Sequence, residues 1–234
     1  MFITMIGHST VLIETGGKKI LTDPYWGTWG NPAYARIGTP AKSRQELSKV
    51  DCVLISHDHW DHVDGQYLRM LGDTPVIAPK LTRWLIKLLG GQNILGIKTG
   101  ESIRIGEVSA TAVPAVHVTV ATGFVLQSEN KQVYFTGDTF YHSFMRDIGH
   151  QFQLDVALMP VTTFRIPMTM GEKQAMQAVQ VLKPAVVIPI HLGIKPRSPL
   201  LRTNQTPEHF AKRLAESGVT TKVVILREGE SYTV

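Results

Sequence analysis

The segment from His57 to His62 holds four side chains that can bind metal ions, and they lie within six residues: His57, His59, Asp61 and His62. Imidazole nitrogens combined with carboxylate oxygens are the ligands expected for zinc, manganese or iron. Because alternate residues of an extended segment point the same way, His57 and His59 can share one ion. Asp61 and His62 come after the chain turns and can reach a second ion beside the first.

The residues just before this motif indicate how it is positioned. Residues 50–55 are largely apolar and rich in β-branched side chains, which predicts a buried strand that ends at the motif. An ordinary surface loop is the alternative, with Asp61 serving to cap a helix expected from Asp64 to Leu71. The pattern H-x-H-x-D-H directly after an apolar strand favours the metal interpretation.

Three further candidate ligands each follow a predicted apolar strand: His117 after residues 108–113, Asp138 after residues 132–135 and His191 after residues 185–190. Gly137 would allow a close backbone approach just before Asp138. Asp138 can either cap the next segment or bridge two metal ions. Every candidate ligand therefore lies at or just after the end of a predicted strand.

Two more polar residues follow strands near the start of the chain. His8 and Asp23 are either turn residues or members of the site, where Asp23 would accept a hydrogen bond from a metal-bound imidazole and His8 would contact substrate or a ligand. Arg165, Lys195, Arg197 and Arg202 lie on loops on the expected metal side. They either bind an anionic group of the substrate or form a solvated basic face.

The remaining elements must hold these residues in place. Strands are expected over residues 2–6, 11–14, 19–22, 75–78, 94–98, 102–105, 123–127, 156–160, 223–226 and 231–234. Helices are expected over residues 81–89, from a capping box at Thr169 and Glu172 to Pro184, and from Thr206 to Ser217. The aromatic residues Tyr25, Trp26, Trp29 and Tyr34 lie in an irregular stretch, residues 24–44, that is either a lid or a loop packed by its own side chains.

Composition limits the class of protein. The chain has 234 residues, 43% hydrophobic and 18% charged, and we expect residues 1–234 to form a single domain. No apolar stretch is long enough for a membrane span, and the start lacks the basic region of a signal peptide. The single cysteine, Cys52, excludes an internal disulfide and is compatible with a cytoplasmic location.

The charge balance bears on partners. A net charge of +5 is a mild basic bias that permits a small, anionic substrate. No dense run of lysine and arginine is present, so nucleic acid is an unlikely partner. A homo-oligomer is possible.

The ligand set, in this order along the chain, resembles that of the metallo-β-lactamase superfamily. The resemblance implies an α/β fold, a four-layer αββα sandwich with metals at one edge of two sheets. It implies two divalent metal ions per chain, zinc foremost, with manganese or iron as alternatives. The implied ligands are His57, His59 and His117 for the first ion, Asp61, His62 and His191 for the second, and Asp138 bridging both.

Shorter motifs are similar to one branch of that superfamily. They are Gly7-His8-Ser9-Thr10-Val11-Leu12, Leu21-Thr22-Asp23-Pro24, Met170-Gly171-Glu172 and Pro189-Ile190-His191-Leu192-Gly193. The branch contains ascorbate-6-phosphate lactonase-like proteins, N-acylphosphatidylethanolamine phospholipase D-like proteins and other metal-dependent hydrolases. These motifs do not fix a substrate.

The resemblance implies a binuclear metal-dependent hydrolase, lactonase- or phosphodiesterase-like. A hydroxide bridging two divalent metals would cleave a small anionic ester, lactone or phosphodiester, with Asp61 as the catalytic residue that orients it and passes a proton to the leaving group. The alternatives are a nuclease of the same superfamily and a non-catalytic metal-binding sensor or assembly module. β-Lactamase activity is disfavoured because Asp138 replaces the cysteine that many of those enzymes use.

Overall fold

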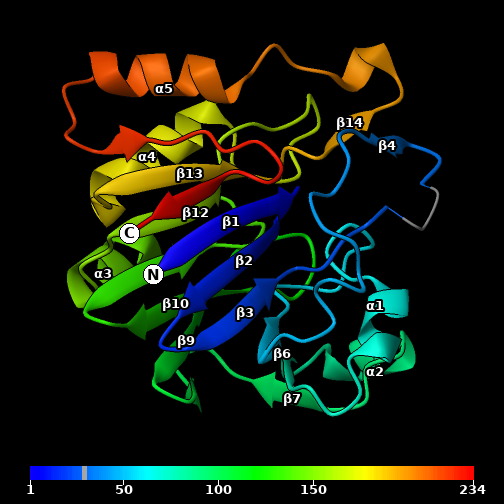
Figure 1. The fold of residues 1–234 in the computed structure, drawn as a ribbon. Coiled ribbons are helices and arrows are strands. Elements are labelled where there is room, and N and C mark those ends of the chain that lie inside the picture. The colour runs from blue at the N-terminus through cyan, green and yellow to red at the C-terminus, as the bar shows by residue number, and fades with distance from the viewer. Residues whose placement is uncertain (28–30) are drawn as a thin grey trace.

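The strands of the chain form two large sheets and one short ribbon (Figure 1), in a computed structural model that describes residues 1–27 and 31–234. The first sheet has the strand order β16 (Ser231–Thr233), β1 (Phe2–Gly7), β2 (Thr10–Thr15), β3 (Lys18–Thr22), β5 (Cys52–Leu54), β6 (Val76–Pro79) and β7 (Ile94–Ile97). The second has the order β15 (Lys222–Val223), β13 (Val186–Ile190), β12 (Val156–Pro160), β11 (Lys131–Phe135), β10 (Thr122–Ser128), β9 (Val108–Pro114) and β8 (Ser102–Ile105). The ribbon pairs β14 (Ile194–Pro196) with β4 (Tyr34–Arg36).

Helices cover the outer face of each sheet, which confirms the predicted four-layer αββα sandwich (Figure 1). The first sheet carries α1 (Gly65–Met70) and α2 (Arg83–Leu88), and the second carries α3 (Phe144–Gln151), α4 (Glu172–Leu182) and α5 (Pro207–Glu216). A short 3₁₀ turn, η1, spans Pro199–Leu201. None of the helices in the described ranges is long and apolar enough to cross a membrane.

Strand alternation explains why so much of the sequence is apolar. In β2, Val11 and Ile13 face the layer between the sheets, whereas Leu12 packs toward α1 and α2. In β11, Val133 faces the same inner layer, whereas Tyr134 packs toward the helices of the second sheet. Because both faces are covered, successive residues are all buried and the strands form continuous hydrophobic runs.

Strand direction brings the candidate residues to one edge of the sandwich. In the first sheet β1 and β3 are both antiparallel to β2, and β5 is parallel to β3, so all three end at the same edge. In the second sheet β9 and β11 are both antiparallel to β10, and β12 and β13 continue parallel to β11. The residues that follow these strands are His8, Asp23 and His57 in the first sheet and His117, Asp138 and His191 in the second.

The two sheets touch at this edge. Thr122 N donates a hydrogen bond to Ser56 O at 2.9 Å. Gly137, at a φ of +57°, lies so close to Ser56 that an added Cβ would collide with the serine side chain. This is the close backbone approach that the sequence predicted, and a side chain here would force the sheets apart.

One helix start differs from the prediction. The capping box at Thr169 and Glu172 is wrong, because α4 begins at Glu172 and its N-cap is Gly171. Thr169 instead donates its hydroxyl to Thr139 O at 3.2 Å. The Glu172 carboxylate accepts hydrogen bonds from His209 and Arg213 of α5, so it joins two helices rather than capping one. Contacts with Thr139 and with α5 therefore replace the local capping interaction that was expected of Thr169 and Glu172.

Other differences concern short elements. Helix α3 and the ribbon strands β4 and β14 were not predicted, and the strand expected over residues 223–226 extends only over Lys222–Val223. The last prediction failed because the chain leaves the sheet edge after two residues of pairing with β13. Cys52 is fully buried between the sheets, as expected for a core residue.

The aromatic stretch, residues 24–44, packs partly against the core and partly over a pocket, and its role as a lid stays a prediction. Tyr25 is buried, and Trp26 donates its indole N–H to Lys42 O and packs on Tyr67 at 4.9 Å between ring centroids. Tyr34, by contrast, sits on β4 and lines a pocket over the site described below. Trp29 lies outside the described residues.

We predict that Gly137→Ala destabilises the protein by about 3 kcal/mol, because alanine must adopt a left-handed conformation and its Cβ must displace Ser56. The matched control is Gly72→Ala, which has a φ of +54° and open space around the added Cβ. The control should cost about 1 kcal/mol. Chemical denaturation of both variants measures the difference, and equal losses would show that sheet contact at Gly137 is unimportant.

Candidate metal centre

Three histidines from both sheets form the first cluster. The ring centroids of His57, His59 and His117 lie 4.5 to 4.7 Å apart. His59 Nδ1 faces His117 Nε2 at 3.2 Å. Two nitrogens bound to one tetrahedral zinc at 2.0–2.1 Å would lie about 3.3 Å apart. The cluster thus has the spacing of ligands that share a cation.

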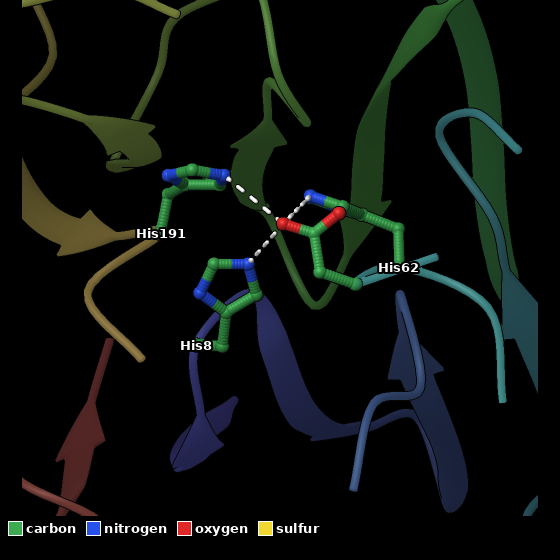
Figure 2. Close-up of side chains that lie close together, drawn as sticks. His8, His62 and His191 are labelled. Atoms are coloured by element: carbon green, nitrogen blue, oxygen red, sulfur yellow. Dashed lines mark hydrogen bonds and ion pairs between the residues drawn. The ribbon is translucent and has the colours of Figure 1, made fainter. Parts of the chain in front are cut away.

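A second cluster surrounds the Asp61 carboxylate. Its Oδ2 atom lies 3.3 Å from His8 Nε2, 3.6 Å from His191 Nε2 and 3.9 Å from His62 Nε2. Figure 2 shows the rings of His8, His62 and His191 pointing toward a common centre. All four residues are buried, so this group could also hold a cation.

Asp138 lies against the second cluster, and its charge also acts on His57 and His117 of the first. Its Oδ2 atom lies 3.0 Å from His191 Nε2 and 3.5 Å from His62 Nε2. The rings of His57 and His62, which belong to different clusters, have centroids only 4.1 Å apart. A carboxylate against one of two adjacent clusters is a candidate for a ligand that both share. The N-cap of α1 is Asp64, which accepts a hydrogen bond from Tyr67 N, so the alternative role of Asp61 as a helix cap is wrong.

Asp23 fixes the protonation of one histidine in each cluster. Its carboxylate accepts hydrogen bonds from Ser56 N at 2.7 Å, from the Ser56 hydroxyl at 2.6 Å and from His62 Nδ1 at 2.6 Å. Since the Ser56 hydroxyl donates to Asp23, it must accept from His57 Nδ1, which is 2.8 Å away. Both imidazoles therefore carry a proton on Nδ1, which leaves Nε2 as the nitrogen that would bind a metal. Burial disfavours the charged form of His62, but Asp138, Asp23 and Asp61 outweigh it and hold its pKa well above the usual value, so a cation that binds there displaces a proton from Nε2.

The candidate ligand atoms that face the interior of the site have the chemistry that a metal requires. Among the described residues, His57 Nε2, His62 Nε2 and Asp138 Oδ1 are fully buried and have no hydrogen-bond partner. Leaving three such groups unpaired is costly unless something else satisfies them. Ligand imidazoles usually donate their other N–H to a carboxylate or a similar acceptor, as His62 does here. The donor set and its outer hydrogen bonds therefore fit divalent cations.

Burial and neighbouring charge set the protonation of the ligands. Burial holds the pKa of His57 well below its usual value and lowers that of His117 to about 4. Burial also disfavours the charged form of His191, but Asp138 and Asp61 outweigh it and raise its pKa to about 9. Without metal, His191 is thus protonated at neutral pH, and a cation that binds there displaces this proton.

The backbone of the site is strained. His8, Asp23 and His191 have φ values of +61°, +32° and +64°, in a region that residues other than glycine rarely adopt. His191 N donates to His8 O at 3.1 Å, which ties the loops of the two sheets together. Strain at three site residues indicates that their positions are determined by the surrounding structure rather than by local preference.

His8 is held as a neutral hydrogen-bond donor. Gly193 N donates to His8 Nδ1 at 3.1 Å, so the ring proton is on Nε2 and points to Asp61. Burial lowers the pKa of His8 to about 3, which keeps the ring neutral at physiological pH. An added Cβ on Gly193 would meet His8 Cβ at 2.6 Å, so glycine is needed there.

The predicted basic residues lie away from the clusters. Arg165 is exposed, and its backbone N–H donates to Leu201 O. Arg197 is exposed and donates its Nε to Asn31 O at 3.3 Å. Lys195 and Arg202, the other two predicted basic residues, line a hollow next to the site.

A small pocket opens directly above the two clusters. This inner pocket has a volume of about 130 Å³, and its floor is formed by His59, Asp61, Asp138 and His191. Its walls are Tyr34, Trp60, Phe164, Met168 and Ile194. Of these wall residues, sequence reasoning had considered only Tyr34, as part of an aromatic stretch with a possible lid role, and it overlooked Ser56. The position of Ser56 between the strand and the motif was the one available signal.

Comparison with known proteins identifies the family. A model of the beta-lactamase superfamily domain matches residues 2–191, so the chain belongs to this superfamily, as predicted. The chain is 32% identical to a UPF0173 metal-dependent hydrolase of Methanopyrus kandleri, with 99% of both chains covered. A relative in Pyrococcus furiosus is 31% identical over 98% of this chain and 97% of its own. The protein is therefore a metal-dependent hydrolase of the UPF0173 family.

Solved structures agree with this assignment. A metallo hydrolase from Ignicoccus hospitalis is 27% identical, with a TM-score of 0.79, and the match covers 100% of this chain and 98% of that one. An isothiocyanate hydrolase from Delia radicum gut bacteria has a TM-score of 0.81 at 20% identity, covering 100% and 99%, which shows a shared fold. The narrower resemblance to lactonase-like and phospholipase D-like proteins stays a prediction.

We predict that Asp23→Asn weakens metal binding by about ten- to a hundredfold. The amide N–H₂ would face His62 Nδ1 and move the ring proton to Nε2, which blocks the lone pair that a metal needs. Metal titration against a competing chelator measures the change. Asp155→Asn is the control, since Asp155 accepts similar hydrogen bonds from Lys131 and Gln132 away from the site. Equal effects in both variants would contradict the role of Asp23.

Proposed function

We propose that the protein is a binuclear hydrolase that acts on a small ester, lactone or phosphodiester. The observation that carries the proposal is the pair of adjacent clusters, with buried and unpaired ligand atoms in both: His57 Nε2 in the first and His62 Nε2 in the second. Asp138 lies against the second cluster and has a free, buried oxygen that can reach the first. A single metal would leave one set of these atoms unsatisfied.

The two clusters support the ligand assignment that the resemblance implies. The first ion would be held by His57, His59 and His117 and the second by Asp61, His62 and His191, with Asp138 as a ligand available to both. Zinc is the leading candidate, and manganese and iron tolerate the same ligands. Two such ions supply an activated water at neutral pH and neutralise negative charge that develops on the substrate.

Asp61 is the proposed proton carrier. Burial alone would raise the pKa of Asp61, but His62 and the hydrogen bonds from His191 and His8 hold it well below its usual range. Asp61 is thus a carboxylate that can accept a proton from the attacking water and deliver it to the leaving group. His8 donates Nε2–H to Asp61 Oδ2 and so keeps the carboxylate oriented toward the pocket floor.

A larger hollow extends the inner pocket. This outer hollow has a volume of about 390 Å³ and shares Phe164, His191 and Ile194 with the inner pocket. Lys195 and Arg202 line it, but Arg202 donates hydrogen bonds to the carbonyls of Pro196 and Arg197. Lys195 is therefore the proposed contact for a negative charge on a part of the substrate distant from the reacting bond.

The test is turnover by one metal-loaded sample against bis(p-nitrophenyl) phosphate, simple lactones and p-nitrophenyl esters. We expect two metal ions per chain and hydrolysis of at least one class. Asp61→Asn should lower kcat by about a hundredfold or more, because it removes the proton carrier and weakens the second ion. Metal content is measured on the same sample, so loss of metal and loss of proton transfer are separated.

Asp51→Asn is the matched control, since Asp51 binds Lys18 Nζ and Lys19 N remote from the clusters and should keep full activity. Two bound metals with no turnover across the whole panel would contradict the hydrolase proposal and favour a metal sensor. Hydrolysis of RNA in preference to every small substrate would favour the nuclease alternative.

A further inference from the structure

The walls of the inner pocket come from four separate parts of the chain. Tyr34 lies on β4, Trp60 inside the ligand motif, Phe164 and Met168 on the loop after β12, and Ile194 on β14. The rings are arranged around the opening, with centroids 5.2 Å apart for Tyr34 and Phe164 and 6.3 Å apart for Tyr34 and Trp60. Segments far apart in sequence thus supply one continuous apolar wall.

These wall residues are available to a ligand. The side chains of Tyr34, Trp60, Phe164 and Met168 are only half-buried, although each is large and apolar or aromatic. The ring centroid of Phe164 lies 6.4 Å from that of His191, on the floor of the pocket. Half-buried aromatic residues directly above a candidate metal centre gain most when an apolar group covers them.

The charges around the pocket restrict what can enter it. None of the described residues that line it is lysine or arginine, so apart from the proposed metal ions its lining offers no partner for an anionic group. A carboxylate or phosphate placed against the wall would lose its hydration without gaining a cationic partner from the protein. The basic residues Lys195 and Arg202 line the outer hollow instead.

The volume of the inner pocket limits the size of the group that it can accept. The volume of about 130 Å³ is close to that of a cavity known to accept benzene, about 150 Å³. The remaining part of a substrate can extend into the outer hollow, which shares Phe164 and Ile194 with the inner pocket. A flat or branched group of a few carbon atoms therefore fits beside the reacting bond.

We propose that the inner pocket is a substrate subsite for an uncharged, apolar group, of at most benzene size, directly attached to the bond that is hydrolysed. The subsite rests on the proposed function, since it takes the two clusters as the reacting centre. It assigns the substrate class as esters or lactones with a neutral apolar substituent at the reacting carbon. Any negative charge on the substrate would lie at the end distant from the hydrolysed bond, toward Lys195 in the outer hollow.

Binding of hydroxamates to the metal-loaded protein tests the subsite without turnover, because a hydroxamate attaches to the metals and projects one substituent. Calorimetry should show that benzohydroxamate binds about tenfold more tightly than acetohydroxamate, from burial of the ring. A carboxylate at the para position of the ring should remove that gain. Phe164→Ala should reduce the gain, whereas Ile166→Ala, at an exposed apolar residue two positions away, should retain it.

Equal affinity for acetohydroxamate and benzohydroxamate, or tighter binding of the carboxylated ring, would overturn the subsite. An effect of Ile166→Ala as large as that of Phe164→Ala would do the same. Hydrolysis of phosphodiesters alone would contradict the substrate class assigned here but not the proposed function. Failure to hydrolyse any substrate of the panel would count against the proposed function, while the hydroxamate preferences, which do not depend on turnover, would still test the subsite.

Discussion

A buried carboxylate with three hydrogen bonds, Asp23, is the interaction on which the site depends. It holds His62 directly and His57 through the Ser56 hydroxyl, so both imidazoles present the same nitrogen to the interior. If the protons moved to Nε2, the lone pairs that a cation requires would be lost in both clusters. In the candidate metal centre, Asp23 therefore determines which imidazole nitrogens of His57 and His62 face a cation, although Asp23 would not itself bind the metal.

The rest of the fold brings these groups together at a cost. The six strands that precede the site residues end at one edge of the sandwich, and the loops after them carry positive φ values at His8, Asp23 and His191. Gly137 and Gly193 allow the loops of the two sheets to approach more closely than side chains would permit. Strain and unpaired buried atoms are tolerated at functional sites when they are repaid by ligand binding, which is the relation we infer here.

The sequence predicted the layered fold and the convergence of the candidate metal ligands. Both rest on local features: the periodicity of the strands and the positions of histidine and aspartate at strand ends. It left the roles of His8 and Asp23 open, since nothing local distinguishes a turn residue from a hydrogen-bond partner 39 positions away, as His62 is from Asp23. The walls of the inner pocket were missed for the same reason: Tyr34 and Phe164 meet only through tertiary structure. Thr169 and Glu172 matched a capping pattern, but α5 engages Glu172 instead.

The most direct test of the account is a crystal structure of the metal-loaded protein, with the ions located by anomalous scattering. We predict two ions about 3.5 to 4 Å apart, one bound by His57, His59 and His117 and the other by Asp61, His62 and His191, with Asp138 touching both. Asp23 would keep its hydrogen bond to His62 Nδ1. A single ion, or ions bound away from these residues, would contradict the account.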